Sequence, residues 1–137
     1  LEPVYAFAAE VGIKLPEGEF HWEDRELSIL PGALPDLTGL NLIRTGLYAG
    51  RLAEGRFVPS HALALALEQQ QAARQLDFSA ESSEVERYLK GETLLLGEDV
   101  LPGNGWILVM VDGFPLGWAK RLRGLIKNHY PAAWRYL

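Results

Sequence analysis

The feature that most constrains the fold of this chain is an unbroken apolar run in its last third. Trp106-Ile107-Leu108-Val109-Met110-Val111 contains no polar residue, and Gly103-Asn104-Gly105 directly precedes it. A short apolar run bounded by turn residues predicts a buried strand, because too few residues are present for a typical helix. Gly103-Asn104-Gly105 leads into a strand instead of opening a helix, so it is interpreted as a hairpin turn.

The residues around this run predict several short strands and one helix. Further strands are expected at residues 93–96, 116–122 and 125–126, between glycine-rich turns. Ser83-Glu84-Val85-Glu86 has the pattern of a capping box and predicts a helix over about residues 82–90. Glu86 and Lys90 are spaced to pair on that helix, and Gly91 suits its C-terminal end. Short strands with one helix predict a small, partly closed barrel.

The first half of the chain predicts a mixture of helix and strand. Val4, Phe7, Ala8 and Val11 have the spacing of an amphipathic helix from Pro3 to Ile13, which Gly12 would end. A hairpin is expected from residues 20–30, extended chain from 41–52, and a returning strand at 57–58. Ser60 is placed to cap a helix over 61–67, and the glutamines at 69–71 to form a polar connection. The predicted class is therefore α+β.

Charge is distributed unevenly along the chain. The net charge is −5, which disfavours nucleic acid because phosphate neutralisation supplies much of such affinity. Residues 100–137, however, hold five cations against Asp112, a balance of +4, and the remainder holds 8 basic and 17 acidic residues. Those cations are Lys120, Arg121, Arg123, Lys127 and Arg135. A basic segment on an acidic body is typical of an RNA-binding surface, and a solvated strand face is the alternative.

Composition excludes several classes of site. With zero cysteines there is no disulfide framework and no thiolate metal site. His21, His61 and His129 lack the spacing of paired metal ligands, so no metal is expected. Apolar runs are shorter than the ~18 residues that a membrane span needs, so no membrane partner is expected either. The chain begins at Leu1 and its single methionine is Met110, from which we expect it to be a piece of a longer protein.

Three stretches resemble a known family, in the family's order. They are Gly46–Leu67, then Leu76-Asp77-Phe78-Ser79 with Arg87–Glu92, and finally Gly113–Lys120 with Leu125–Pro131. Together they are similar to the C-terminal tail of the bacterial ribosomal RNA cytosine 5-methyltransferases of the RsmF/YebU type. The resemblance implies a small mixed α/β domain over residues 1–75. It also implies a barrel with one helix over 76–137, like the pseudouridine-synthase/archaeosine-transglycosylase (PUA) RNA-binding domain.

The family's chemistry indicates what this chain lacks. Members use cysteine thiolates to add to the cytosine ring and S-adenosylmethionine as methyl donor, and this chain has no cysteine. It also has no glycine-rich turn between a strand and a helix. We therefore expect no catalytic residue and no cofactor here, with S-adenosylmethionine bound by the parent enzyme.

The resemblance implies a bacterial, cytoplasmic, non-catalytic region that binds and positions 16S ribosomal RNA. Its partners would be ribosomal RNA and an N-terminal catalytic domain. Two alternatives stay open. One is a structural module that braces the enzyme with little RNA contact, and the other is a free-standing RNA-binding protein.

The candidate RNA-binding residues lie in the predicted barrel. Lys120, Arg121 and Arg123 are predicted to meet phosphates, and Lys127 with Asn128 to combine a phosphate contact with a base-edge contact. Tyr130 and Trp118 are candidates for stacking on unpaired bases. The alternatives are core packing for Trp118 and a structural turn for residues 128–131. After Pro131 the chain departs from the family, with Ala132 and Ala133 in place of a basic residue and a glycine.

Overall fold

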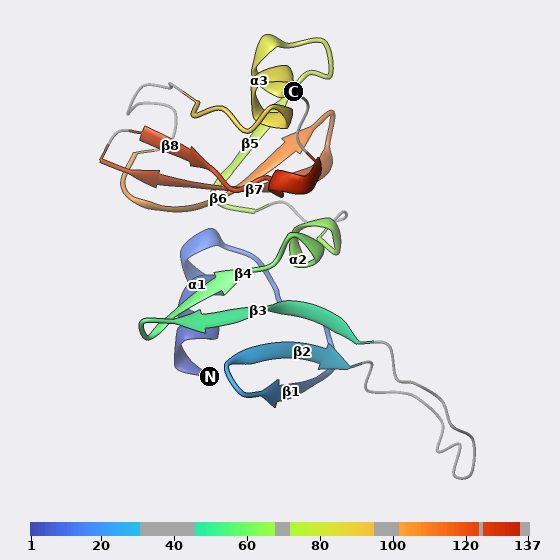
Figure 1. The fold of residues 1–137 in the computed structure, drawn as a ribbon, viewed down its shortest axis with the longest axis vertical. Helices are drawn as coiled ribbons and strands as arrows, with labels where there is room; N and C mark the ends of the chain where they lie inside the picture. The colour runs from blue at the N-terminus through green and yellow to red at the C-terminus, as the bar shows by residue number, and fades with distance from the viewer. Residues whose placement is uncertain (31–45, 68–71, 95–101, 124, 135–137) are drawn as a thin grey trace, which may run out of the picture.

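The computed structural model describes residues 1–30, 46–67, 72–94, 102–123 and 125–134. Over these residues the chain forms two four-stranded sheets accompanied by three α-helices (Figure 1). The α+β class predicted from the sequence is confirmed, and the second half has a mixed fold consistent with a PUA-like domain.

Helix α1 (Glu2–Val11) opens the chain, as the apolar spacing predicted. Gly12 ends it in the left-handed conformation, with φ 76°, and the Gly12 amide donates to the Ala8 carbonyl. Val4, Phe7, Ala8 and Val11 are buried, which confirms the predicted inner face.

The first sheet is an antiparallel meander in the order β1-β2-β3-β4. Its strands are β1 (Glu19–Glu23), β2 (Glu26–Leu30), β3 (Leu47–Ala53) and β4 (Arg56–Pro59). Strand β3 contains a bulge near Gly50, since Leu27 pairs with Gly50 but Ser28 pairs with Tyr48. The extended stretch predicted from residue 41 is seen from Leu47, and residues 41–45 lie outside the described residues.

Ser60 caps helix α2 (His61–Leu65), where its Oγ accepts the Leu63 amide at 3.0 Å. The predicted cap is confirmed, and the helix is two residues shorter than the predicted 61–67. The polar connection at 69–71 lies outside the described residues.

The second sheet begins with a parallel pair. β5 (Gln75–Phe78) runs parallel to β6 (Gly105–Val111), and helix α3 (Ser83–Leu89) lies in the connection between them. β7 (Phe114–Leu122) and β8 (Leu125–Asn128) complete the order β5-β6-β7-β8. Of the strand predicted at 93–96, Leu94 forms a bridge to Ile126, and residues 95 and 96 lie outside the described part.

The predicted capping box of α3 is wrong. The N-cap is Ser82 instead of Ser83, and it makes no side-chain capping hydrogen bond. Ser83 therefore lies inside the first turn, where its hydroxyl donates to the Glu84 carboxylate at 3.4 Å. The predicted Glu86–Lys90 pair is confirmed at 3.2 Å, and so is Gly91 at the helix end with φ 84°.

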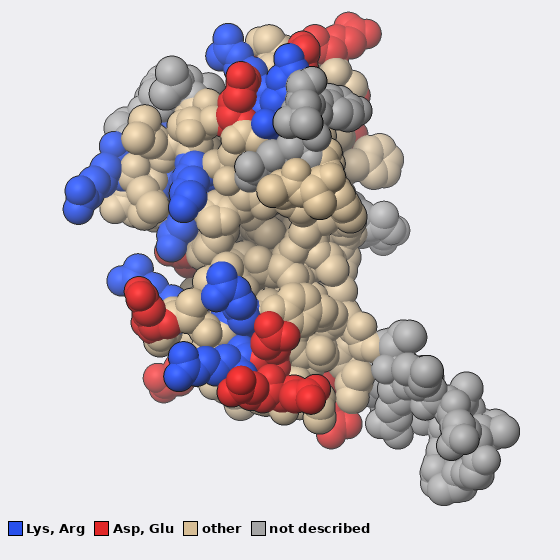
Figure 2. Space-filling model, in the orientation of Figure 1, with Lys and Arg blue, Asp and Glu red and all other residues tan. Residues whose placement is uncertain are grey.

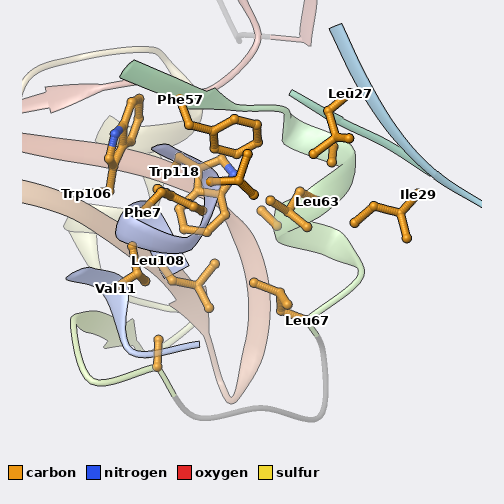
Figure 3. Packing of buried hydrophobic residues seen from close by; sticks show 14 of the residues in the cluster. Phe7, Val11, Leu27, Ile29, Phe57, Leu63, Leu67, Trp106, Leu108 and Trp118 are labelled. Atoms are coloured by element: carbon orange, nitrogen blue, oxygen red, sulfur yellow. The ribbon is translucent and has the colours of Figure 1, made fainter. Parts of the chain in front are cut away.

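The larger hydrophobic core contains residues from both sheets (Figure 3). Phe7 and Val11 of α1 and Phe57 of β4 pack with Trp106 of β6 and Trp118 of β7. A smaller core on the other face of the second sheet is formed by Leu76, Tyr88, Leu94, Ile107, Val109, Ala119 and Ile126. The division into residues 1–75 and 76–137 stays a prediction, because the larger core includes residues from both sides of it.

Candidate nucleic-acid interface

The direction of each side chain on β7 and β8 decides which cations can meet a ligand. Successive side chains of a strand point to opposite faces of the sheet. Trp118 belongs to the larger core and Ala119 to the smaller one. Lys120 therefore lies on the Trp118 face, and Arg121 on the face that α3 covers.

Lys120 and Lys127 form a cross-strand pair of like charges. Lys120 is directly opposite Trp106 on one side and Lys127 on the other. The Lys120 ammonium lies 5.0 Å from the centroid of the Trp106 ring, which favours a cation there. Like charges directly opposite each other destabilise a sheet, so this pair provides a position where an anion would be stabilising. Arg123 and Lys127 are exposed.

Arg121 does not share this exposed surface. Its side chain has 0% exposure, and its strand partners are Gly105 and Ile126. Burial removes Arg121 from the RNA-contacting set that the sequence predicted. Sequence counting had grouped it with Lys120 because the two are adjacent, although adjacent strand residues face opposite ways.

Trp118 is a core residue. It is 1% exposed, its ring centroid lies 5.4 Å from that of Phe7, and its indole N–H donates to the Ser60 carbonyl at 2.8 Å. No base can stack on a ring enclosed in this way, so the predicted stacking contact is not compatible with the structure. The core alternative stated for Trp118 is the one that the structure supports.

Asn128 supports the fold instead of facing solvent. Its side-chain amide donates to the carbonyls of Tyr88 at 2.8 Å and Glu92 at 3.0 Å, and its Oδ1 accepts the Tyr130 amide at 2.7 Å. The residue is 7% exposed. The predicted base-edge contact is therefore replaced by a structural role, in which Asn128 ties β8 to the C-terminal end of α3.

Tyr130 belongs to an aromatic cluster between α2 and the 3₁₀ turn η1 (Ala132–Trp134). Its ring centroid lies 5.3 Å from Tyr88, 5.6 Å from His61 and 6.3 Å from Trp134. Burial lowers the pKa of His61 below its usual value. Tyr130 is partly buried and Trp134 is 55% exposed, so Trp134 presents the more accessible ring. Base stacking on Tyr130 stays a prediction.

The sequence reasoning missed a groove of about 420 Å³ that residues from both halves line. Arg56 of β4 and Lys120 of β7 contribute cations to it, and Glu10 of α1 contributes a carboxylate. Lys and Arg side chains follow one edge of the molecule across both sheets, with Asp and Glu among them mainly over the first sheet (Figure 2). The sequence did not indicate Arg56, because the summed charge of the first half is acidic and a sum hides a single well-placed cation.

Metal-ligating groups and membrane-spanning helices bear on the class of site. No group of three or more His, Cys, Asp or Glu that could hold a metal ion occurs among residues 1–30, 46–67, 72–94, 102–123 and 125–134. In the same ranges, no helix has both the length and the apolar character required to cross a membrane.

Two family models match the two halves of the chain. Residues 6–67 match the RsmF rRNA methyltransferase first C-terminal domain, and residues 75–136 match the Methyltransferase RsmF PUA domain. Together the two matches cover most of the chain and define its class as the C-terminal domains of RsmF-type proteins. The chain belongs to the RsmF-type methyltransferase family and corresponds to that family's C-terminal region.

Individual relatives agree with this assignment. The chain is 30% identical over 126 residues to Ribosomal RNA small subunit methyltransferase F of Shewanella oneidensis, covering 91% of this chain and 26% of the relative. The Klebsiella pneumoniae protein of the same name is 29% identical over 130 residues, covering 93% and 26%. For the Erwinia tasmaniensis protein the values are 30% over 132 residues, 95% and 27%. The chain thus spans about a quarter of the length of these relatives.

Proposed function

We propose that this chain is the non-catalytic, RNA-binding and positioning region of an S-adenosylmethionine-dependent 16S ribosomal RNA cytosine 5-methyltransferase that acts in the cytoplasm. The match of both halves to C-terminal domains of this family supports the assignment. The catalytic domain and the S-adenosylmethionine site would belong to the rest of the parent protein. The chain itself holds zero cysteines, so it supplies no thiolate for attack on the cytosine ring.

The observation that carries the RNA-binding role is the cross-strand pair of Lys120 and Lys127, with exposed Arg123 nearby in the sequence. Cations at this edge of the second sheet would contact phosphates. Such contacts position a protein on RNA without reading the RNA sequence. Folded ribosomal RNA would be bound mainly by shape and phosphate contacts. Affinity from such a remote module assists methyl transfer by holding the catalytic domain over its target nucleotide.

A bracing role is the second candidate, and exposed apolar residues at the start of the chain favour it. Leu1 is 57% exposed and Tyr5 is 55% exposed, both near the first turn of α1. A neighbouring domain of the parent would cover side chains of this kind. The net charge of −5 also agrees with a module that contacts protein more than RNA.

Salt-dependent RNA binding separates these two roles. Binding of the chain to 16S ribosomal RNA segments should weaken steeply with salt, because each neutralised phosphate releases condensed counterion. Lys127→Ala should weaken all RNA sequences about equally and reduce the magnitude of the log–log salt slope by about 1. Arg87→Ala, which removes one exposed cation from α3, is the matched control and should leave the slope unchanged. An RNA affinity that salt does not change would favour the bracing role.

A further inference from the structure

We infer that the groove between α1, the β3–β4 turn and strands β6 and β7 binds one unpaired RNA nucleotide bearing an exocyclic amino group. This inference rests on the proposed RNA-binding function and specifies where an unpaired segment would enter. The groove differs from the exposed edge at Lys127, because its walls come from both halves of the chain. We refer to it below as the inter-sheet groove.

The charges of the inter-sheet groove suit one phosphate. Arg56 follows the β3–β4 turn on the first sheet, whereas Lys120 lies near the C-terminal end of β7 on the second. Two cations against the single carboxylate of Glu10 leave a balance of +1, which complements a phosphodiester. The Trp106 ring below the Lys120 ammonium holds that cation near the groove, at 5.0 Å from the ring centroid.

The size and lining of the groove suit one nucleotide. About 420 Å³ falls in the range of about 300–1,000 Å³ that is usual for small-molecule pockets. Apolar side chains of Phe7, Phe57 and Trp106 contribute to the lining. An apolar lining combined with a few polar groups fixes the orientation of a small ligand. A base within a duplex would first have to be unpaired and unstacked, so the favoured occupant is a nucleotide that is already unpaired.

Glu10 provides the reason to expect an amino-bearing base. An ionised carboxylate accepts hydrogen bonds only, so it complements the amino group of cytosine, adenine or guanine. Uracil has no amino group, and its one N–H on the pairing edge lies between two carbonyl oxygens that repel a carboxylate. Glu10 Oε2 accepts the Trp106 amide at the long distance of 3.4 Å, which leaves Oε1 available. A Cβ atom on Gly105 would lie 2.9 Å from that Oε1, so glycine at this position leaves room for the carboxylate.

A second hollow of about 600 Å³ lies at the β1–β2 and β3–β4 turns and has the opposite charge balance. Arg25 and Arg51 contribute cations there, against the carboxylates of Glu23, Asp24, Glu26 and Glu54. Its balance of −2 repels phosphate. Size alone therefore does not identify a nucleotide site, because the larger hollow has the wrong charge. The inter-sheet groove is distinguished by its positive charge balance and by its mixed polar and apolar lining.

Titration with mononucleotides tests the site directly. Cytidine 5′-monophosphate added to the chain should shift the NMR signals of the Trp106 side chain and the Gly105 amide. Uridine 5′-monophosphate should bind roughly fivefold more weakly, because it offers Glu10 no amino donor. Glu10→Gln should bring the two affinities within about twofold of each other without lowering binding of the uridine nucleotide. Shifts confined to the His61–Trp134 cluster, or no shifts, would overturn the inference.

RNA binding by variants separates this inference from the proposed function. Arg56→Ala should weaken binding of a short single-stranded RNA roughly fivefold and leave binding of an RNA duplex unchanged. Arg25→Ala is the matched control, since it removes an exposed cation from a hairpin turn of the same sheet and should change neither. If Arg56→Ala has no effect while Lys127→Ala does, the groove inference fails and the proposed function stands. If ribosomal RNA does not bind at all, the proposed function fails, and the mononucleotide titration still decides whether the groove is a nucleotide site.

Discussion

The two sheets have the same number of strands but differ in how many of their faces are covered. Strand β2 of the first sheet alternates between buried and more exposed residues, whereas six successive residues of β6 in the second sheet, Gly105–Met110, are buried. The difference arises because α1 and the larger core cover one face of β6, and the smaller core with α3 covers the other. The second sheet is therefore covered on both faces along β6. Its candidate RNA-contacting cations, Lys120, Arg123 and Lys127, lie where the sheet is no longer buried on both faces.

The largest expected effect is on stability, from removing the Trp118 ring, which packs in the core that both sheets contribute to. Trp118→Ala should lower the free energy of unfolding by about 3–5 kcal/mol, because a large buried side chain is replaced by a cavity. The first and second sheets should lose structure together, since Phe7 and Phe57 pack in the same core. Chemical denaturation followed by far-UV circular dichroism measures this loss.

Trp134→Ala is the control for that experiment, because Trp134 is 55% exposed. It should change stability by much less than Trp118→Ala. Two separate unfolding transitions in the Trp118→Ala protein would show that the sheets are stabilised independently and would contradict the comparison above.

The next effect concerns a polar residue of the second sheet. Asn128→Ala should cost roughly 2–3 kcal/mol of stability, since it removes three hydrogen bonds, two to the Tyr88 and Glu92 carbonyls and one from the Tyr130 amide. Lys127→Ala, one residue earlier and exposed, should cost less than about 0.5 kcal/mol. Thermal denaturation of the two variants side by side tests this. Equal losses would mean that Asn128 does not support α3.

A smaller effect should have opposite signs for stability and for binding. Lys127→Glu places a carboxylate opposite Lys120 and should stabilise the sheet by about 0.2–1 kcal/mol at low salt. The same change should weaken RNA binding more than Lys127→Ala does, because it adds repulsion to the lost contact. Arg123→Glu is the control for the stability measurement. Arg123 has no position in the β7–β8 strand register, so this change should not stabilise the sheet. Denaturation and RNA-binding titrations on the same preparations measure both signs.

The smallest effect is a dependence of stability on pH. The pKa of His61 is lowered by burial, so the folded state keeps this residue neutral at a pH where the unfolded state binds a proton. Its contribution to stability is therefore present above the unfolded pKa of about 6.5 and is lost as the pH falls toward the lower folded value. The melting temperature should fall more between pH 7.5 and pH 5.5 for the parent chain than for His61→Gln. Equal changes in the two proteins would contradict this assignment.

The sequence predicted elements whose cause is local. The apolar spacing of α1, the cap at Ser60, the β1–β2 and β3–β4 turns and the apolar run of β6 each depend on neighbouring residues. Strand β5 was not predicted as a strand, because its four residues include Asp77 and its pairing with β6 is with a distant segment. Parallel pairing of this kind has no signature in the short segment itself.

The candidate site was predicted in part. The location of cations near the end of β7 and on β8 followed from counting charges, and Lys120, Arg123 and Lys127 are accessible or partly accessible. Counting could not show that Arg121 and Asn128 are buried, because burial depends on which elements cover each face of the sheet. The inter-sheet groove was beyond sequence reasoning, since Glu10, Arg56 and Lys120 are far apart in the chain.

The position of α1 has a consequence for how the protein is made. Its inner face packs against β6, and Phe7 meets Trp106 with ring centroids 6.3 Å apart. The ribosome must therefore add about a hundred residues after Phe7 before this partner exists, which takes roughly 5–20 s at about 5–20 residues per second. During that interval the residues that β6 and β7 contribute to the larger core are not yet available to the apolar face of α1. Helix α1 thus completes its packing only when β6 has been translated.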